Sequence, residues 1–441
     1  AMGIQHSAPT AMVLGVSCAS AGNCTAVGNF KNSGGNTEAF TMTSTNGTWG
    51  LATPVIFATN SQDNAPDAGL KSVSCASAGN CTAVGNFKNW KGWRRAFSVT
   101  STNGVWSAPT VALFANGLEY KEPEAKFFSI SCVAPGICTA VGYFRDSIGG
   151  YEPFSQSSIT ISTSIKTVIV WNNARRTPIS IYTPSHALPE ANFNSVSCWG
   201  TYTCAAVGSF KNTTAGTDAM WSVSGFGSVS YELVFSDATA SFFGKTTQST
   251  WHQSTLNSIS CVSTGQCTAV GQFKNADGGY EAFTQTASTA DAQPAVFSAG
   301  VQNTSPDAGF HSVSCASPGN CTAVGIFKNR VGDFEAFSMT SVNWAWGLAT
   351  PAVFPAGLQK ISPFIKVGGT RATRSIASSF NIFVRKGTKL STKVRKSSAK
   401  VCRLSGLKVI ALKPGTCDLV FTYLATAVEK VSRDVALRVV E

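Results

Sequence analysis

A short cysteine motif returns six times along this 441-residue chain. Its first copy begins with Val16-Ser17-Cys18, and five residues separate Cys18 from Cys24. The second cysteine of each copy leads into Ala-Val-Gly, then one variable residue, Phe, and Lys or Arg. The six pairs are Cys18/Cys24, Cys75/Cys81, Cys132/Cys138, Cys198/Cys204, Cys261/Cys267 and Cys315/Cys321. A period of roughly 50 residues, with apolar residues alternating with small polar ones, restricts the chain to an all-β repeat architecture.

Each repeat supplies four predicted antiparallel strands. In the first repeat the two cysteines lie on the first and second strands, and the third strand follows at residues 38–43. An Asn46-Gly47 turn then leads to Trp49 on an outer strand, because Asn-Gly adopts the positive φ angles of a two-residue hairpin turn. Four strands per repeat predict a six-bladed β-propeller over residues 13–357, preceded by an N-terminal arm at residues 1–12.

The cysteine count favours disulfides and an oxidising compartment. All 14 cysteines fall into regularly spaced pairs, since Cys402 and Cys417 add a seventh pair near the end of the chain. The metal-binding alternative is weak, because no Cys-x-x-Cys occurs and the four histidines share no motif. We therefore expect seven disulfides, no metal, no cofactor, and a secreted or cell-surface protein. Each of the six repeat bridges is interpreted as a local staple that pins the neck of one hairpin and adds roughly 2 kcal/mol.

The first residues and the lack of a long apolar run also fit a secreted or cell-surface protein. Ala1-Met2-Gly3 is typical of a cloning remnant, so we expect an export signal upstream of it. No run approaches the ~20 apolar residues of a membrane span.

Two further positions recur in every repeat. Gly28 and its counterparts lie inside the second strand, where a glycine indicates a bulge or a close backbone approach. The recurring Phe and Trp residues are interpreted as core between sheets rather than as a ligand cage.

The loop between the second and third strands begins with a cation and meets an acid seven residues later, as in Lys31 and Glu38. We expect this pair to face across the hairpin.

The second repeat departs from the pattern, because its loop reads Lys88-Asn89-Trp90-Lys91-Gly92-Trp93-Arg94-Arg95. Basic groups interleaved with tryptophan suit an anionic, carbohydrate or protein partner, and drift on a solvated loop is the alternative. The candidate binding residues here are Trp90, Lys91, Trp93, Arg94 and Arg95.

Charge separates the chain into two parts. Residues 1–360 hold 18 Lys/Arg and 18 Asp/Glu, whereas residues 361–441 hold 16 and 4 and carry the whole net charge of +12. The shift predicts a linker and a basic module over residues 358–441. Its cationic run is either a solvated face or a site for an anionic partner such as cell-wall polymer or acidic glycan. The candidate residues are Arg385, Lys386, Lys389, Lys393, Arg395, Lys396 and Lys400.

The basic module resembles bacterial immunoglobulin-like domains. The resemblance rests on Cys402-Arg403-Leu404-Ser405-Gly406 and on the run from Ala411 to Cys417, Ala-Leu-Lys-Pro-Gly-Thr-Cys. It implies a small β-sandwich closed by Cys402 and Cys417, and the short alternating strands of this region fit such a fold.

The repeats themselves, with Ser-Cys-x5-Cys-Thr-Ala-Val-Gly and Glu-Ala-Phe-Thr-Met-Thr-Ser-Thr-Asn-Gly-x-Trp, resemble those of WND-domain surface proteins of actinobacteria. That resemblance implies a non-enzymatic, adhesin-like interaction module. Its partners would be host or environmental proteins or glycans and anionic cell-wall or matrix polymers, with nucleic acid least expected and no membrane span.

Two alternatives stay open. A glycan-binding propeller lectin would repeat a polar and aromatic constellation in every blade. A sialidase-like hydrolase is suggested because residues 44–49, Ser-Thr-Asn-Gly-Thr-Trp, are similar to the aspartate-box turn of sialidases, but they lack the aspartate. No carboxylate pair stands out as a glycosidase dyad, so we expect no catalytic residues.

Overall fold

The computed structural model describes residues 10–58, 67–162, 167–172, 174–176, 190–201, 203–211, 216–225, 253–263, 265–286, 289–330, 332–353, 364–379, 390–424 and 430–440. Within these residues the chain is almost entirely β-strand, with one α-helix, α1 (Thr373–Ser379), and one 3-10 turn, η1 (Lys396–Ser398). The all-β prediction is therefore confirmed. The chain divides into two compact units, of which the first holds residues 1–299, 305–327 and 336–351 and the second holds the rest.

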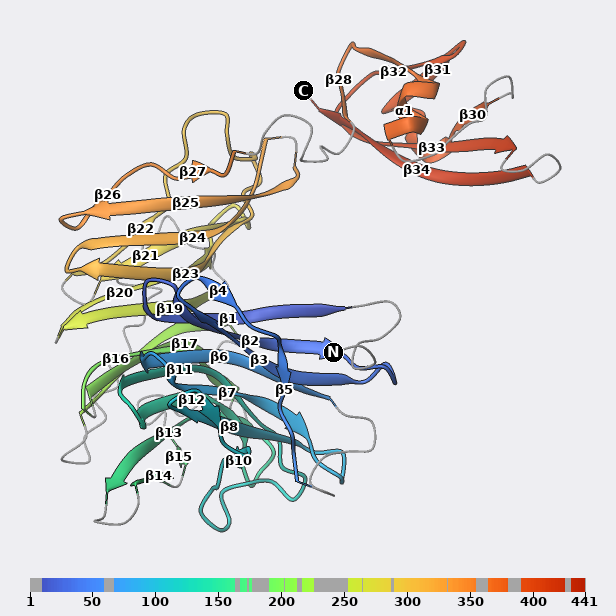
Figure 1. Cartoon of the computed structure of the whole chain (residues 1–441). Helices are drawn as coiled ribbons and strands as arrows, with labels where there is room; N and C mark the ends of the chain where they lie inside the picture. Colours follow the sequence, from blue (N-terminus) through green and yellow to red (C-terminus); the bar gives the residue numbers. More distant parts are fainter. Residues whose placement is uncertain are drawn as a thin grey trace. The chain divides into compact units, whose positions relative to one another are not determined.

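Each cysteine repeat forms one antiparallel sheet, and we number these repeat sheets one to six (Figure 1). Sheets one to three contain β1 (Ala11–Ser20), β2 (Asn23–Lys31), β3 (Thr37–Thr45), β4 (Thr48–Trp49) and β5 (Thr53–Pro54); β6 (Ala68–Ser77), β7 (Asn80–Lys88), β8 (Arg94–Thr102), β9 (Val105–Trp106) and β10 (Thr110–Val111); and β11 (Ala125–Ala134), β12 (Ile137–Arg145), β13 (Tyr151–Ser162), β14 (Thr167–Trp171) and β15 (Arg175–Arg176). Sheets four to six contain β16 (Ala191–Gly200), β17 (Thr203–Lys211) and β18 (Thr217–Gly225); β19 (Ser254–Ser263), β20 (Gln266–Lys274), β21 (Tyr280–Thr286) and β22 (Thr289–Pro294); and β23 (Ala308–Ser317), β24 (Asn320–Lys328), β25 (Phe334–Val342), β26 (Ala345–Trp346) and β27 (Thr350–Pro351).

In sheets one, two, three and six the predicted fourth strand is split in two. In sheet one, β4 pairs with the end of β3 and β5 pairs with its middle, so both short pieces border the same strand. The Asn46-Gly47 turn is confirmed, since it joins β3 to β4 with φ angles of 50° and 85°. In sheet six the same turn is Asn343-Trp344, and Trp344 also has a positive φ, of 71°.

All seven predicted disulfides are confirmed. Six of them join directly opposed residues of the first and second strands, as Cys18 and Cys24 do. The seventh joins Cys402 to Cys417, and no cysteine is left free.

The repeat bridges join the two strands of single hairpins, as expected, and five of the six also take part in packing between sheets. In repeats two to six the second cysteine is a core residue, only 2–4% exposed. The reason is that its sulfur faces the preceding sheet: the Thr25 hydroxyl of sheet one donates to Cys81 Sγ at 3.3 Å, and Cys81 shares a buried cluster with Val27. These bridges therefore also pack between sheets, and no ligand can reach their second sulfur. The five buried cysteines are Cys81, Cys138, Cys204, Cys267 and Cys321.

The recurring glycine is required by a close backbone approach. The first strand bulges beside it, with a register shift between Val13 and Gly15 in sheet one and at the matching place in the other five sheets. An added Cβ at Gly28 would lie 1.8 Å from the carbonyl oxygen of Met12, and at Gly85 it would lie 1.9 Å from that of Gly69. Both alternatives given by the sequence, bulge and close approach, are thus present together.

Adjacent repeat sheets pack face to face. Between sheets one and two, Val27 of β2 packs with Leu70 and Val73 of β6 in one buried cluster. A serine hydroxyl also bonds across each junction, because the backbone N–H of Cys75 donates to Ser17 Oγ at 3.0 Å. The same bond recurs at the four following junctions, at 2.9–3.0 Å.

The aromatic residues divide between core and surface. Phe87 and Phe97 are fully buried and the counterpart phenylalanines are at most 8% exposed, which confirms the core prediction for phenylalanine. Trp49 is 45% exposed, so the prediction was wrong for this residue. It lies on the short β4 at the outer end of sheet one, where only β3 pairs with it.

The second unit holds two further sheets around one core. The first sheet contains β28 (Phe364–Lys366), β34 (Lys430–Val440), β33 (Gly415–Leu424) and β30 (Ser391–Val394), in that order, and the second contains β29 (Thr370–Ala372), β32 (Lys408–Ala411) and β31 (Cys402–Ser405). Leu419 and Phe421 of the first sheet and Val409 of the second are fully buried in a shared cluster. The Cys402–Cys417 disulfide links the two sheets through this core.

The glycine contact yields a test of the repeat geometry. Gly85→Ala should destabilise the protein by about 2 kcal/mol or more, because the new methyl group collides with backbone rather than with a movable side chain. Gly50→Ala is the matched control, since its methyl group meets only one atom, at 3.4 Å. Thermal unfolding measures both variants, and equal stability of the two would contradict the close approach.

Candidate ligand-binding site

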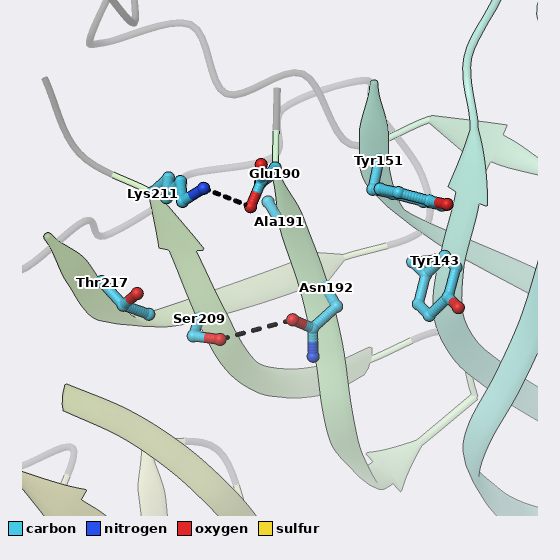
Figure 2. Close-up of a pocket in the computed structure, with 8 residues that line it drawn as sticks. All are labelled: Tyr143, Tyr151, Glu190, Ala191, Asn192, Ser209, Lys211 and Thr217. Carbon is cyan, nitrogen blue, oxygen red and sulfur yellow. Dashed lines mark hydrogen bonds and ion pairs between the residues drawn. The ribbon is translucent and has the colours of Figure 1, made fainter. Parts of the chain in front are cut away.

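A pocket of about 350 Å³ lies between repeat sheets three and four (Figure 2). One wall comes from β12 and β13. The other wall comes from the strands of sheet four and from Glu190, which immediately precedes β16. The backbone of Tyr151 forms a parallel bridge to Glu190, which fixes the two walls to each other. The lining residues are Tyr143, Tyr151, Glu190, Ala191, Asn192, Ser209, Lys211 and Thr217.

The aromatic wall is held by one carboxylate. The rings of Tyr143 and Tyr151 meet edge to face, with centroids 5.2 Å apart. Both hydroxyl groups donate to Glu124, which lies behind the wall, at 3.1 Å and 3.0 Å. Lys126 Nζ is 3.2 Å from the same carboxylate and lies over the Tyr143 ring. The two rings are therefore fixed in orientation before any ligand arrives.

The facing wall is polar. Lys211 Nζ and Glu190 Oε2 form an ion pair at 2.7 Å, and Ser209 Oγ donates to Asn192 Oδ1 at 3.3 Å. Figure 2 shows these side chains across the pocket from the two tyrosines. Apolar ring surface opposite amide, hydroxyl and charged groups is the composition of a site for a small polar ligand with apolar C–H faces.

Three titrating groups of the aromatic wall have shifted pKa values. Burial alone would raise the pKa of Glu124, but hydrogen bonds from Tyr151, Lys126 and Tyr143 and the charge of Lys126 outweigh it, so the pKa lies below its usual value. Burial raises the pKa of Tyr143 and Tyr151, and the Glu124 carboxylate raises both further. Glu124 is thus a fixed anion and the two tyrosines are fixed hydrogen-bond donors at neutral pH.

Sequence reasoning missed this pocket, although its signal is present in the repeats. Tyr143 occupies the variable position of the Gly-x-Phe motif, where the other repeats have Asn, Ser, Gln or Ile. Glu124 and Glu190 each stand immediately before the first strand of a repeat, as do Asp67 and Asp307. A comparison of the repeats position by position would have found both signals.

The tip of the loop of repeat two is exposed to solvent. Trp90 is 63% exposed, and Lys91 Nζ lies 4.9 Å and 4.8 Å from the ring centres of Trp90 and Trp93. The two arginines are compensated by acids outside the hairpin: Arg94 pairs with Asp67, and Arg95 pairs with Glu119 at 3.3 Å. These two arginines therefore hold the loop to neighbouring acids, while Trp90 and Lys91 are exposed at its tip and Trp93 is half-buried.

The loop and the pocket are electrostatically connected. The Arg94 guanidinium lowers the pKa of the Tyr143 hydroxyl, although burial and Glu124 outweigh it. Arg94 and Tyr151 hold the same repeat position, opposite Lys88 and Arg145, so the loop and the aromatic wall lie at the same end of successive sheets.

The expected pairing of Lys31 with Glu38 is wrong. In the register of the hairpin Glu38 lies opposite Phe30, and Lys31 lies opposite Thr37, so the two charged side chains point to opposite faces of the sheet. The Glu38 carboxylate instead accepts a hydrogen bond from Asn32 Nδ2 at 2.6 Å. The matching Asn–Glu bond recurs in repeats five and six at the same distance.

The basic run is described only in part. Arg385, Lys386 and Lys389 lie outside the described residues. The other members, Lys393, Arg395, Lys396 and Lys400, lie on β30 and around η1, and all four are exposed. The described segments contain no cluster of three His, Cys, Asp or Glu side chains suited to a metal ion and no helix long and apolar enough to cross a membrane.

Comparison with known proteins leaves the family open. No family model matches the chain, and no curated protein matches it. Among solved structures, a sialidase of Trypanosoma rangeli is similar over 88% of this chain and 56% of its own, at 8% identity and a TM-score of 0.37. A fucose-specific lectin of Aleuria aurantia is similar over 79% and 98%, at 10% identity and a TM-score of 0.35.

A Dyadobacter fermentans protein of unknown function gives a TM-score of 0.35 at 12% identity, over 76% of this chain and 95% of its own. The chain spans between half and two thirds of the sialidases it matches. Scores at this level define neither the fold nor the activity of the chain.

The shifted pKa of Glu124 gives a pH test. Its folded pKa lies below the unfolded value of about 4.3, so the carboxylate contributes stability above that pH, and the contribution disappears as pH falls through the folded pKa. Glu124→Gln should therefore cost about 1–2 kcal/mol at pH 7 and progressively less towards pH 3. Glu122→Gln, an exposed neighbour, is the control in thermal unfolding across this range, and a pH-independent loss for Glu124→Gln would contradict the assignment.

Proposed function

We propose that this chain is an extracellular, non-catalytic recognition protein whose repeat region binds glycan in the pocket between repeat sheets three and four. The observation that carries the proposal is the pair of oriented tyrosine rings opposite Asn192, Ser209 and the Lys211–Glu190 pair. Sugar rings present C–H faces that stack on aromatic rings and hydroxyl groups that bond to amides and charged groups.

The carboxylates of this region fit binding better than hydrolysis. A general acid needs a carboxyl group whose pKa is raised towards neutrality. Glu124 has a lowered pKa and holds two tyrosine hydroxyls, and Glu190 is paired with Lys211. These engagements support a binding role and argue against the sialidase-like alternative.

We further propose that the six repeat sheets are the blades of a six-bladed β-propeller and that the second unit is an immunoglobulin-like domain. Six antiparallel sheets that share the order of their first three strands and are joined by one repeated junction support the first assignment. Two sheets around one core with a disulfide between them support the second.

Seven disulfides support a secreted or cell-surface location, and the repeat motif supports a relationship to actinobacterial WND-domain surface proteins.

The basic unit supplies a second contact, with an anionic polymer, because Arg395, Lys396 and Lys400 are exposed within six residues of one another. In this arrangement the adhesin-like role is divided. The repeat region selects the partner, and the basic unit attaches to a cell-wall or matrix surface.

Glycan binding is tested by substituting the aromatic wall. Tyr151→Ala should weaken binding on a glycan array at least tenfold, or about 1.4 kcal/mol, by removing the stacking surface. Tyr280→Ala is the matched control, because Tyr280 holds the same repeat position in sheet five and its hydroxyl donates to Gln253 instead. Equal loss in both variants, or no glycan bound by the parent protein, would refute the proposal.

The polymer contact is tested by charge. Lys396→Gln with Lys400→Gln should lower the salt concentration that elutes the protein from heparin, since attraction between exposed charges is screened by salt. Lys31→Gln with Lys121→Gln removes the same charge from exposed positions of the repeat region and should have little effect. A larger shift in this second variant would place the contact on the repeats.

A further inference from the structure

A second pocket, of about 400 Å³, lies between repeat sheets one and two at the end that carries the disulfides. Sheet one lines it with the end of β1, the start of β2 and the end of β3, and sheet two adds the end of β6 and two turns. The tyrosine pocket lies instead where second strands end and third strands begin. The two pockets are therefore at opposite ends of the repeat sheets.

Three threonines of sheet one form one wall of this second pocket. Thr25 lies opposite Thr43 in the register, and Thr45 follows two residues later, so all three side chains are on one face of the sheet. That face meets sheet two, because Thr25 Oγ1 lies 3.3 Å from Cys81 Sγ. Thr25 is buried, Thr43 is half-buried and Thr45 is exposed, so the threonines lead from the floor of the pocket to its mouth.

The facing wall is held by the Asn103-Gly104 turn of sheet two. The backbone N–H of Gly104 donates to the carbonyl oxygen of Gly79 at 2.8 Å. The backbone N–H of Asn103 donates to Asn80 Oδ1 at 3.0 Å. Asn80 Nδ2 in turn donates to Ser77 Oγ at 3.0 Å, so the hydroxyl hydrogen of Ser77 stays available to a ligand. This wall is therefore in place before a ligand binds.

The pocket offers hydrogen-bonding groups without charge. Among the described residues, the hydroxyls of Thr43 and Thr45 and the side-chain amide of Asn103 have no protein partner. Ala19 and Ala78 add methyl groups. No lining residue is ionisable, since the cysteines among them are all in disulfides. An ion here would lose water without meeting an opposite charge, so the lining favours an uncharged ligand rich in hydroxyl groups.

The corresponding space is filled in two other repeat sheets. In sheet three, a methyl group added at Gly136 would lie 2.7 Å from Ile169 Cγ1. In sheet six, a methyl group added at Gly319 would lie 2.8 Å from the ring of Trp344, which replaces the glycine of the Asn-Gly turn. A methyl group added at Gly104 would meet no atom within 4 Å. The pocket beside sheet two thus stays open because its turn ends in glycine.

We propose that this pocket binds one uncharged sugar residue, so that the chain has two glycan sites. The sugar hydroxyls donate to and accept from Thr43, Thr45 and the Asn103 amide, and the sugar C–H groups contact the methyl groups of the pocket. Because the two sites lie at opposite ends of the repeat sheets, one protein chain links two glycan chains. Linking goes beyond the recognition proposed for the tyrosine pocket, and the second site does not depend on the tyrosines.

NMR on protein labelled at its threonine methyl groups tests the site. The probes are the methyl glycosides of glucose, galactose, mannose and N-acetylglucosamine, with the methyl glycoside of glucuronic acid as the charged counterpart of the glucoside. At least one neutral probe should shift the Thr43 and Thr45 signals to saturation, with an affinity at least about tenfold above that of the glucuronic acid probe. No shift with any neutral probe would overturn the proposal, and so would equal binding of the charged one.

Closing the pocket gives the second arm. Gly104→Trp introduces the residue that sheet six carries at the same turn, where Trp344 has a φ of 71°. It should weaken the binding read at Thr43 at least about tenfold. Gly47→Trp is the matched control, because Gly47 is the turn glycine of sheet one, bonds in the same way to Gly22 and lies outside the pocket. Full affinity in Gly104→Trp, or equal loss in both variants, would contradict the site.

Thr45→Val leaves the turn unchanged and removes one hydroxyl at an exposed position. Binding read at Thr43 should weaken about fivefold, and unchanged binding would argue against the site. Tyr151→Ala should leave the Thr43 response as it is. Since this site has no aromatic ring for stacking, it binds more weakly than the tyrosine pocket, and binding on a glycan array reports on the latter. Failure of the proposed function is therefore read on the array and failure of the second site at Thr43.

Discussion

The face-to-face junction between consecutive repeat sheets is the contact on which the first unit depends. It combines an apolar layer, represented by Val27 against Leu70 and Val73, with a hydrogen bond from a cysteine N–H to a serine hydroxyl. The apolar layer supplies most of the stabilisation, and the hydrogen bond sets the register in which one sheet meets the next. Because the tyrosine pocket has one wall from sheet three and one from sheet four, its shape is set by the same junction.

Local geometry within each sheet makes this junction repeatable. The glycine of the second strand has no side chain, so a carbonyl of the first strand can approach its backbone closely. The first strand bulges beside this glycine, and a bulge bends a strand and increases its twist. The cysteine pair closes the opposite end of the same two strands. One glycine, one serine and one disulfide therefore recur together, and each fixes a different part of one hairpin.

Much of this was readable from the sequence because the relevant signals are local. The six cysteine pairs, the Asn46-Gly47 turn and the closely approached glycine each depend on residues close together in the chain. The pairing of Lys31 with Glu38 failed because strand register, which spacing alone does not fix, put the two side chains on opposite faces.

What the sequence left hidden depends on contacts between repeats. The tyrosine pocket was not found because Tyr143 and Lys211 come from different repeats and meet only when the sheets pack. The burial of Cys81 was missed for the same reason, since a neighbouring sheet covers it. Likewise, the acids that pair with Arg94 and Arg95 lie outside the hairpin.

The placement of the disulfides has a mechanical consequence for a protein held at a surface. Each repeat disulfide bridges residues only six apart, so it shortens the extended chain by a few residue lengths, roughly 3.5 Å each. Under a pulling force, a repeat sheet that has lost its junctions would therefore still extend over nearly its full contour length. Cys402–Cys417 shields a longer segment, with a sequence separation of 15. The six repeat bridges thus protect the hairpin ends against local opening, while resistance to stretching must come from the contacts between sheets.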